Sequence, residues 1–96
     1  METKYTLEYR PEFTEWINAQ SNLVAARVSS RLARIAFGNF GDAKSLGNGL
    51  YELRFQFGAG VRVYYTQKDE VIVIILGAGT KRTQVKDIQK IRSLIK

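Results

Sequence analysis

Two runs of alternating apolar and polar residues, separated by a short glycine-containing segment, constrain the fold of this chain more than any other feature. In residues 50–57 every second side chain is large and apolar, and residues 61–65 repeat the pattern. Alternation with a period of two indicates strands with one buried face. Gly58-Ala59-Gly60 between the runs suits a tight connection, so they are predicted to form an antiparallel hairpin.

The polar face of this hairpin carries two arginines. With the glycine-containing segment as the loop, Arg54 is expected opposite Tyr64. Gln56 then lies opposite Arg62, and all four side chains share one face. Two guanidinium groups on one small face repel each other unless an anion lies between them, and a phosphate would relieve that repulsion. The alternative is that both are solvated strand residues, with Arg54 paired to Glu52 or to an acid on a neighbouring element.

The N-terminal part of the chain predicts one strand followed by two helices. Residues 4–10 alternate as a half-buried strand does. Pro11 suits the first position of a helix, where its missing N–H is not needed. Ser21 or Asn22 is predicted to cap a second helix, with Gly38 as its C-terminal stop. The two helices are close enough in sequence to form an antiparallel hairpin.

The remaining segments complete the predicted order of elements. Residues 38–49 contain four glycines among polar residues and are expected to be a long loop. Residues 71–76 form an apolar run typical of a strand covered on both faces, and residues 77–82 lead into a final helix. The predicted fold is a single α+β domain over residues 1–96, in the order β-α-α-β-β-β-α, with an antiparallel-rich sheet and the helical hairpin packed on one face. The opposite face is expected to be polar, basic and partly open.

Composition and charge narrow the function classes. The chain contains no Cys and no His, which removes thiolate nucleophiles, imidazole bases and the commonest metal ligands, so no metal or cofactor is expected. No signal peptide or membrane-spanning run is recognised, and a cytoplasmic protein is expected. The formal charge is +6, and residues 51–96 hold nine Lys or Arg against four acids. Such a field favours RNA, DNA or an acidic protein as the partner.

A second basic candidate site follows the last predicted strand. The G-A-G-T-K-R segment ends in Lys81 and Arg82 and combines a flexible backbone with charge at a strand end, a frequent place for ligand contacts. The alternative is a glycine-dependent turn with two surface cations. Lys86 and Lys90 extend the basic surface along the final helix, where an RNA backbone or an acidic protein segment could bind. Asp87 lies among them, either as a weak proton acceptor or as a salt-bridge partner.

Two further features are ambiguous. Tyr64 shares the polar face with Arg54 and could stack on a base or donate a proton. Arg27, Arg31 and Arg34 form a basic stripe on the second predicted helix. A stripe of this kind is most simply a solvated helix face.

Several segments together resemble a known family. The hairpin reads E-L-R-F-Q-F-G-A-G-V-R-V-Y-Y, the loop before it reads G-N-F-G-D-A-K-S-L-G-N-G, and the segment near the chain end reads G-A-G-T-K-R-T-Q-V-K-D-I. The predicted helices contribute F-T-E-W-I and R-L-A-R-I-A-F-G-N-F-G-D. In their order and spacing these segments resemble the RelE/ParE toxin superfamily, particularly its HigB-like "addiction module killer" branch. The resemblance spans nearly the whole chain and implies a β-α-α-β-β-β core, usually with a C-terminal helix.

The resemblance also implies a function, that of a type II toxin which acts as a ribosome-dependent mRNA interferase, an endoribonuclease that inhibits translation. The family's basic positions correspond to Arg54 and Arg62 in the hairpin, to Lys81 and Arg82 after the last strand, and less closely to Lys44 in the loop. These residues would orient the phosphodiester and stabilise developing charge while the ribose 2′-hydroxyl attacks, which leaves a cyclic phosphate and a 5′-hydroxyl.

The chain departs from the family pattern at two places. Glu52 stands where some RelE members carry a lysine, and the Tyr or His that several members place near the chain end is absent. Asp87 falls near that place as a base or an orienting group. The expected catalytic set is therefore Arg54, Arg62, Lys81 and Asp87, and the expected RNA-binding set is Lys44, Tyr64, Arg82, Lys86 and Lys90.

The resemblance implies partners as well. A helix-turn-helix antitoxin of the HigA-like type would cover the basic face or displace the toxin from the ribosome, and oligomers would form only through that complex. Two alternatives remain open at this point. One is ParE-like inhibition of DNA gyrase on the same fold, and the other is a non-catalytic RNA-binding module.

Overall fold

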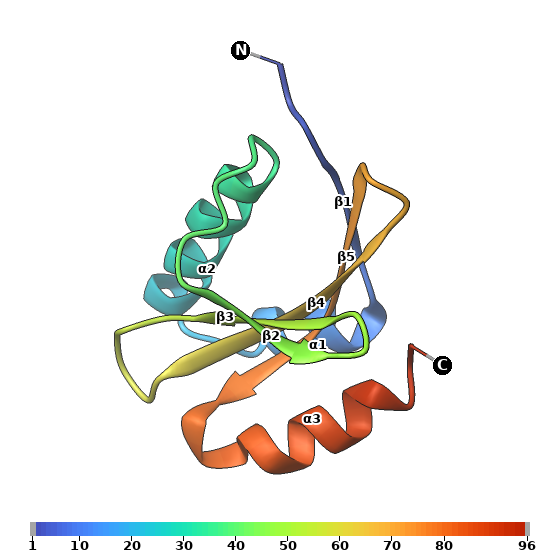
Figure 1. Cartoon of the computed structure of the whole chain (residues 1–96). Coiled ribbons are helices and arrows are strands. Elements are labelled where there is room, and N and C mark those ends of the chain that lie inside the picture. Colours follow the sequence, from blue (N-terminus) through green and yellow to red (C-terminus); the bar gives the residue numbers. More distant parts are fainter. Residues whose placement is uncertain (1, 96) are drawn as a thin grey trace.

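The computed structural model describes residues 2–95 as one sheet with helices on both of its faces (Figure 1). In chain order the elements are β1 (Thr6–Tyr9), α1 (Pro11–Asn18), α2 (Asn22–Ile35), β2 (Ala43–Gly47), β3 (Leu50–Arg54), β4 (Val61–Lys68), β5 (Ile72–Thr80), the short 3-10 helix η1 (Lys81–Thr83) and α3 (Gln84–Arg92). The strands lie in the order β1-β5-β4-β3-β2, with β1 parallel to β5 and the other neighbours antiparallel. The predicted α+β class is confirmed, with one additional strand.

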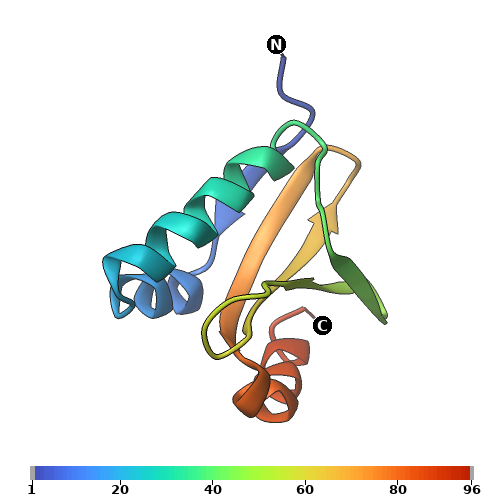
Figure 2. The ribbon, with the colours of Figure 1, turned by 90° about the vertical axis from the view of Figure 1, so that its left-hand side faces the viewer.

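Buried side chains form two clusters, one on each face of the sheet. The larger one joins α1 and α2 to the sheet through residues such as Phe13, Val28 and Val63. The smaller one lies beneath α3 and consists of Leu50, Tyr64, Leu76 and Ile91. Figure 2 shows α1 and α2 together on one side of the strands and α3 apart from them. No helix within residues 2–95 is long and apolar enough to cross a membrane.

The two N-terminal helices begin and end as predicted. Pro11 is the first residue of α1. Ser21 caps α2, because its hydroxyl oxygen accepts a hydrogen bond from the Val24 amide at 3.3 Å. After α2 ends at Ile35, Gly38 takes a positive φ of 91°, which favours glycine at a helix stop.

The expected loop over residues 38–49 is wrong for Ala43–Gly47, which form the edge strand β2 paired to β3. Four of the five β2 side chains are exposed, so no alternation of apolar and polar residues marks the strand in the sequence. Strand β4 also continues to Lys68 and β5 to Thr80, beyond the predicted ends. The sheet is therefore wider and longer than expected.

The register of the central hairpin also differs from the prediction. Arg54 pairs with Arg62, not with Tyr64, because the connection takes up residues 56–60 and so includes Gln56. A shift of two residues leaves every side chain on its predicted face. The two arginines still share a face, and they are now directly opposite each other.

The polar face of the hairpin is covered by α3, which contradicts the expectation of an open face. Tyr64 and Glu52 are both 0% exposed. Only the part of this face near Arg54 and the end of the hairpin remains accessible, since the Arg54 side chain keeps 34% of its surface. The covering helix thus reduces the basic face to a narrower basic edge.

Candidate functional site

A buried carboxylate lies between the two arginines of the hairpin. Oε1 of Glu52 is 3.1 Å from Nε of Arg54 and 3.9 Å from Nε of Arg62. The shorter contact is a hydrogen-bonded ion pair, whereas the longer one is beyond hydrogen-bond reach. The protein therefore supplies the anion that relieves the repulsion between the arginines, in agreement with the alternative in which Arg54 pairs with Glu52.

The same carboxylate holds the first residue of α3. Nε2 of Gln84 donates a hydrogen bond to the second oxygen of Glu52 at 2.5 Å. Because a buried charge without partners is costly, these contacts together keep Glu52 ionised at low cost and fix its neighbours in place. Glu52 thus joins the arginine pair of the hairpin to the N-terminus of α3.

Arg62 lies at the mouth of the hairpin connection. Its Nη1 donates to the carbonyl oxygens of Gly60 and Val61, both at 3.2 Å. The Lys81 amide donates to the same Gly60 carbonyl at 2.8 Å, which brings the start of η1 next to the connection. Arg62 and Lys81 therefore meet at one place, although they come from different elements.

A hollow of about 290 Å³ opens at this meeting point. It is lined by Phe55, Gln56, Phe57, Gly58, Gly60, Arg62 and Lys81. Nε of Arg62 is buried and has no hydrogen-bond partner within residues 2–95. The hollow combines two cations with aromatic walls, an arrangement suited to a phosphate and an attached planar group.

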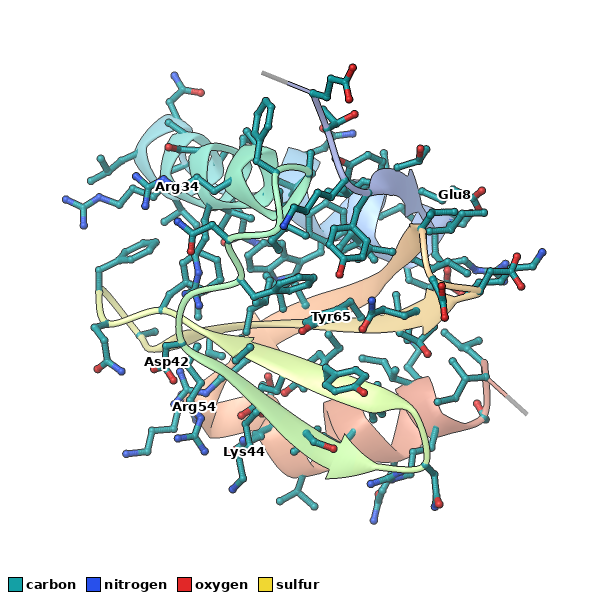
Figure 3. The ribbon with its side chains drawn as sticks, turned by 45° about the horizontal axis from the view of Figure 1, so that its top comes forward. Glu8, Arg34, Asp42, Lys44, Arg54 and Tyr65 are labelled. Atoms are coloured by element: carbon teal, nitrogen blue, oxygen red, sulfur yellow. The ribbon has the colours of Figure 1, made fainter. Side chains whose placement is uncertain are left out.

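Lys44 approaches the cluster from the edge of the sheet. It lies on β2 and pairs in register with Glu52 on β3, and its side chain is exposed. Figure 3 shows Lys44 and Arg54 at this edge. The structure therefore brings together Lys44, Arg54, Arg62 and Lys81, which we call the basic cluster.

Asp87 sits over the strand next to Arg62. The Thr83 hydroxyl donates a hydrogen bond to Oδ2 of Asp87 at 2.6 Å. Gly79 on β5 pairs with Arg62, and a Cβ at Gly79 would collide with the Asp87 carboxylate. Asp87 forms no ion pair within residues 2–95, so the predicted salt-bridge alternative is wrong and the carboxylate is held by a hydroxyl.

The other cations of the C-terminal part lie outside the basic cluster. Arg82 and Lys86 are exposed on η1 and α3. Lys90 is also exposed and lines a separate pocket between α1 and α3.

Tyr64 does not lie on an accessible face. It is fully buried beneath α3, in register with Glu52, and its hydroxyl has no partner within residues 2–95. Burial raises the pKa of Tyr64, and the nearby charges of Glu52 and Asp87 raise this pKa further. The expectation that Tyr64 faces RNA from an open surface is therefore wrong in this arrangement.

Arg31 is the third structural surprise of the site. Its guanidinium donates to the carbonyl oxygen of Arg54, to that of Phe40 at 3.2 Å and to that of Asp42 at 2.8 Å. It also lies over the Phe55 ring, 4.5 Å from the centroid. The solvated stripe expected on α2 is therefore wrong for Arg31, whose pKa is lowered by burial, while Arg27 and Arg34 are exposed.

Two important site residues were not predicted. Glu52 could have been found as the buried anion, since parity places it on the same face as Arg54 and Arg62. No signal in the sequence singles out Gln84, because its contact with Glu52 spans 32 positions of the chain.

Comparison with known proteins gives one family and one fold. A family model described as phage-derived protein, Gp49-like, matches residues 15–96. An uncharacterized protein of Haemophilus influenzae is 45% identical over 83 residues, which is 85% of this chain and 84% of that protein.

The similar solved structures are all of one toxin. A mutant of the E. coli toxin RelE in the free state has a TM-score of 0.70 at 15% identity, covering 88% of this chain and 92% of that chain. The intact E. coli RelBE toxin–antitoxin complex gives a TM-score of 0.67 at 18% identity, covering 79% and 95%. At such identities the likeness shows the fold, so the RelE-like fold expected from the sequence is confirmed.

Proposed function

This chain belongs to the family of phage-derived Gp49-like proteins, and from that premise we propose that it is the toxin of a toxin–antitoxin pair. In this role it cleaves mRNA on the ribosome as an endoribonuclease. The observation that carries the proposal is the convergence of Arg54, Arg62 and Lys81 beside an open hollow at the end of the hairpin. The RelE-like fold supports it, because the similar structures are those of a toxin.

The charge balance of the basic cluster suits a phosphodiester. Four cations and the one carboxylate of Glu52 leave a net charge of +3. Arg62 and Lys81 line the hollow, and Arg54 and Lys44 extend the positive edge beyond it. A phosphate bound there meets donors that are already in place, which is the main source of electrostatic catalysis. Arg82 and Lys86 add outer contacts to the RNA backbone.

The proposed reaction uses the RNA's own 2′-hydroxyl as the nucleophile. The 2′ oxygen forms a bond to phosphorus while the bond to the 5′ oxygen breaks, which gives a cyclic phosphate and a 5′-hydroxyl end. Asp87 accepts the proton of the 2′-hydroxyl, because it is the carboxylate next to Arg62 that is not fully buried. The Thr83 hydroxyl orients it, and Lys81 stabilises the leaving oxygen.

The proposed partners are the ribosome, mRNA and an antitoxin. The similarity to a toxin in complex with its antitoxin supports an antitoxin in general. We propose one of the HigA-like, helix-turn-helix type, which covers the basic cluster and through which alone the protein forms oligomers. Toxin and ribosome would meet in the cytoplasm.

Growth arrest in cells that express the protein without an antitoxin tests the proposal. Removing the arginines alone would leave Glu52 buried without a partner, so the variants are Lys81→Ala and the charge-balanced pair Arg62→Gln with Glu52→Gln. Both are expected to abolish growth arrest. Lys68→Ala, at the other end of β4, is the matched control and should arrest growth like the wild type.

Full growth arrest by both site variants, present at wild-type levels, would rule out the basic cluster as the site. Inhibition of gyrase supercoiling by the purified protein would instead support the ParE-like alternative. Circular dichroism of each variant verifies that the fold is retained.

A further inference from the structure

A second cavity lies on the opposite side of β5 from the basic cluster. It measures about 330 Å³ and is bounded by α1, by Leu76–Ala78 of β5 and by α3. Trp16, Ile91 and Leu94 give it apolar walls. None of the residues of the basic cluster lines it, so it is a separate site.

The free edge of a strand forms one wall of this cavity. The last residue of β1, Tyr9, pairs with Ile75, and the Arg10 amide donates to the Ile75 carbonyl at 2.9 Å. Beyond that point, residues 76–80 of β5 have a strand neighbour only on the β4 side. An unpaired edge of this kind offers N–H and C=O groups to an extended segment of another chain.

The cavity is acidic, although the protein is basic. Glu12 and Glu15 line it from α1 and Asp87 lines it from α3, which is three of the nine acids of the chain. Lys90 is the cation on its wall, and it forms no ion pair within 4 Å with any of the three. The cavity therefore carries a net negative charge on a protein of net charge +6.

One carboxylate oxygen in the cavity is unsatisfied. Oε1 of Glu12 is buried and accepts no hydrogen bond from residues 2–95. Buried acceptors in native proteins are nearly always paired, so an orphaned oxygen in a cavity indicates a missing donor. Because the oxygen belongs to a carboxylate, a cationic donor suits it best.

We propose that this cavity binds the arginine side chain of a partner protein, whose extended segment adds as a strand along the free edge of β5. A guanidinium fits better than an ammonium for two reasons. Its planar fork can bond carboxylates on both α1 and α3, and its face can stack on Trp16. The proposal concerns protein recognition and does not rest on the cleavage of RNA.

A titration with two matched peptides tests the proposal. The peptides are capped pentapeptides, acetyl-Val-Thr-Arg-Val-Thr-amide and the same peptide with citrulline in place of arginine, which keeps the shape and removes the charge. Each is added to the ¹⁵N-labelled full chain and followed by NMR. The arginine peptide is expected to shift the amides of Trp16, Gly77 and Ala78 and to bind at least tenfold more tightly than the citrulline peptide.

Variants locate the charge effect. The pair Glu12→Gln with Glu15→Gln should reduce the preference for arginine to less than threefold, whereas Glu8→Gln, an exposed acid on β1, should leave it unchanged. Equal binding of the two peptides to the wild type would overturn the proposal. So would shifts confined to other surfaces, or no shifts at millimolar peptide. None of these results would bear on growth arrest, so the proposed function is tested separately.

Discussion

At the scale of single residues, Glu52 organises the site. One buried side chain contacts both hairpin arginines and the first residue of α3. Strand parity alone predicted that Arg54 and Arg62 share a face, and this is confirmed by the register. Parity could not show that Glu52 is buried, because that depends on where α3 lies.

Replacing Glu52 with glutamine is expected to destabilise the protein by about 1–3 kcal/mol. The change keeps the shape of the side chain but leaves two guanidinium groups facing each other without an anion. Partial exposure of Arg54 moderates the loss. Urea unfolding measures it, with Asp69→Asn in the exposed turn after β4 as a control expected within about 0.5 kcal/mol of the wild type. Equal stability of Glu52→Gln and the control would contradict the role given to Glu52.

The phenylalanine variant of Tyr64 is expected to be as stable as the wild type at pH 7, or more so, because it removes a buried hydroxyl without a partner. Burial raises the pKa of Tyr64 in the folded state above the unfolded value of about 10. The stability that depends on the neutral phenol is therefore complete below pH 10 and is lost as the pH rises above it. Urea midpoints at pH 7 and about pH 11 should show a smaller alkaline loss for Tyr64→Phe. A midpoint well below that of the wild type at pH 7 would reveal a hydrogen bond of this hydroxyl.

At the scale of elements, the sequence predicted the helices and the central strands but not how they meet. Apolar periodicity and the residues at Pro11, Ser21 and Gly38 were sufficient for α1 and α2. Strand β2 was missed because an exposed edge strand buries too little to need alternation. The hairpin register was wrong because the connection holds five residues, 56–60, and not the three around the glycines.

The position of α3 depends on a glycine in the facing strand. A Cβ at residue 79 would lie 2.7 Å from the Thr83 hydroxyl and would collide with the Asp87 carboxylate. Gly79→Ala is therefore expected to cost about 1–3 kcal/mol of stability by pushing the first turn of α3 from the sheet. Adding Asp87→Ala should restore part of the loss, since it removes the colliding group. Thermal unfolding of the single and double variants measures this, and a double variant no more stable than Gly79→Ala would contradict the account.

At the scale of the whole molecule, the sheet separates two charged regions. The basic cluster lies at the hairpin side of β4 and β5, and the acidic cavity lies at the free edge of β5. Composition predicted the positive charge and motif order predicted the RelE-like fold, which the comparison confirms. The acidic cavity was not predictable, because it is built from α1, β5 and α3 and exists only once these elements are packed together.

The most direct test of the central claim is to map mRNA 5′ ends after the purified protein is added to a reconstituted translation reaction. Wild-type protein is expected to produce new 5′-hydroxyl ends within codons, only when ribosomes are translating, because the basic cluster is proposed to hold the phosphodiester there. Lys81→Ala should reduce the cleavage rate at least about a hundredfold, and Lys68→Ala should leave it unchanged. Intact mRNA in the presence of the folded wild-type protein would contradict the account.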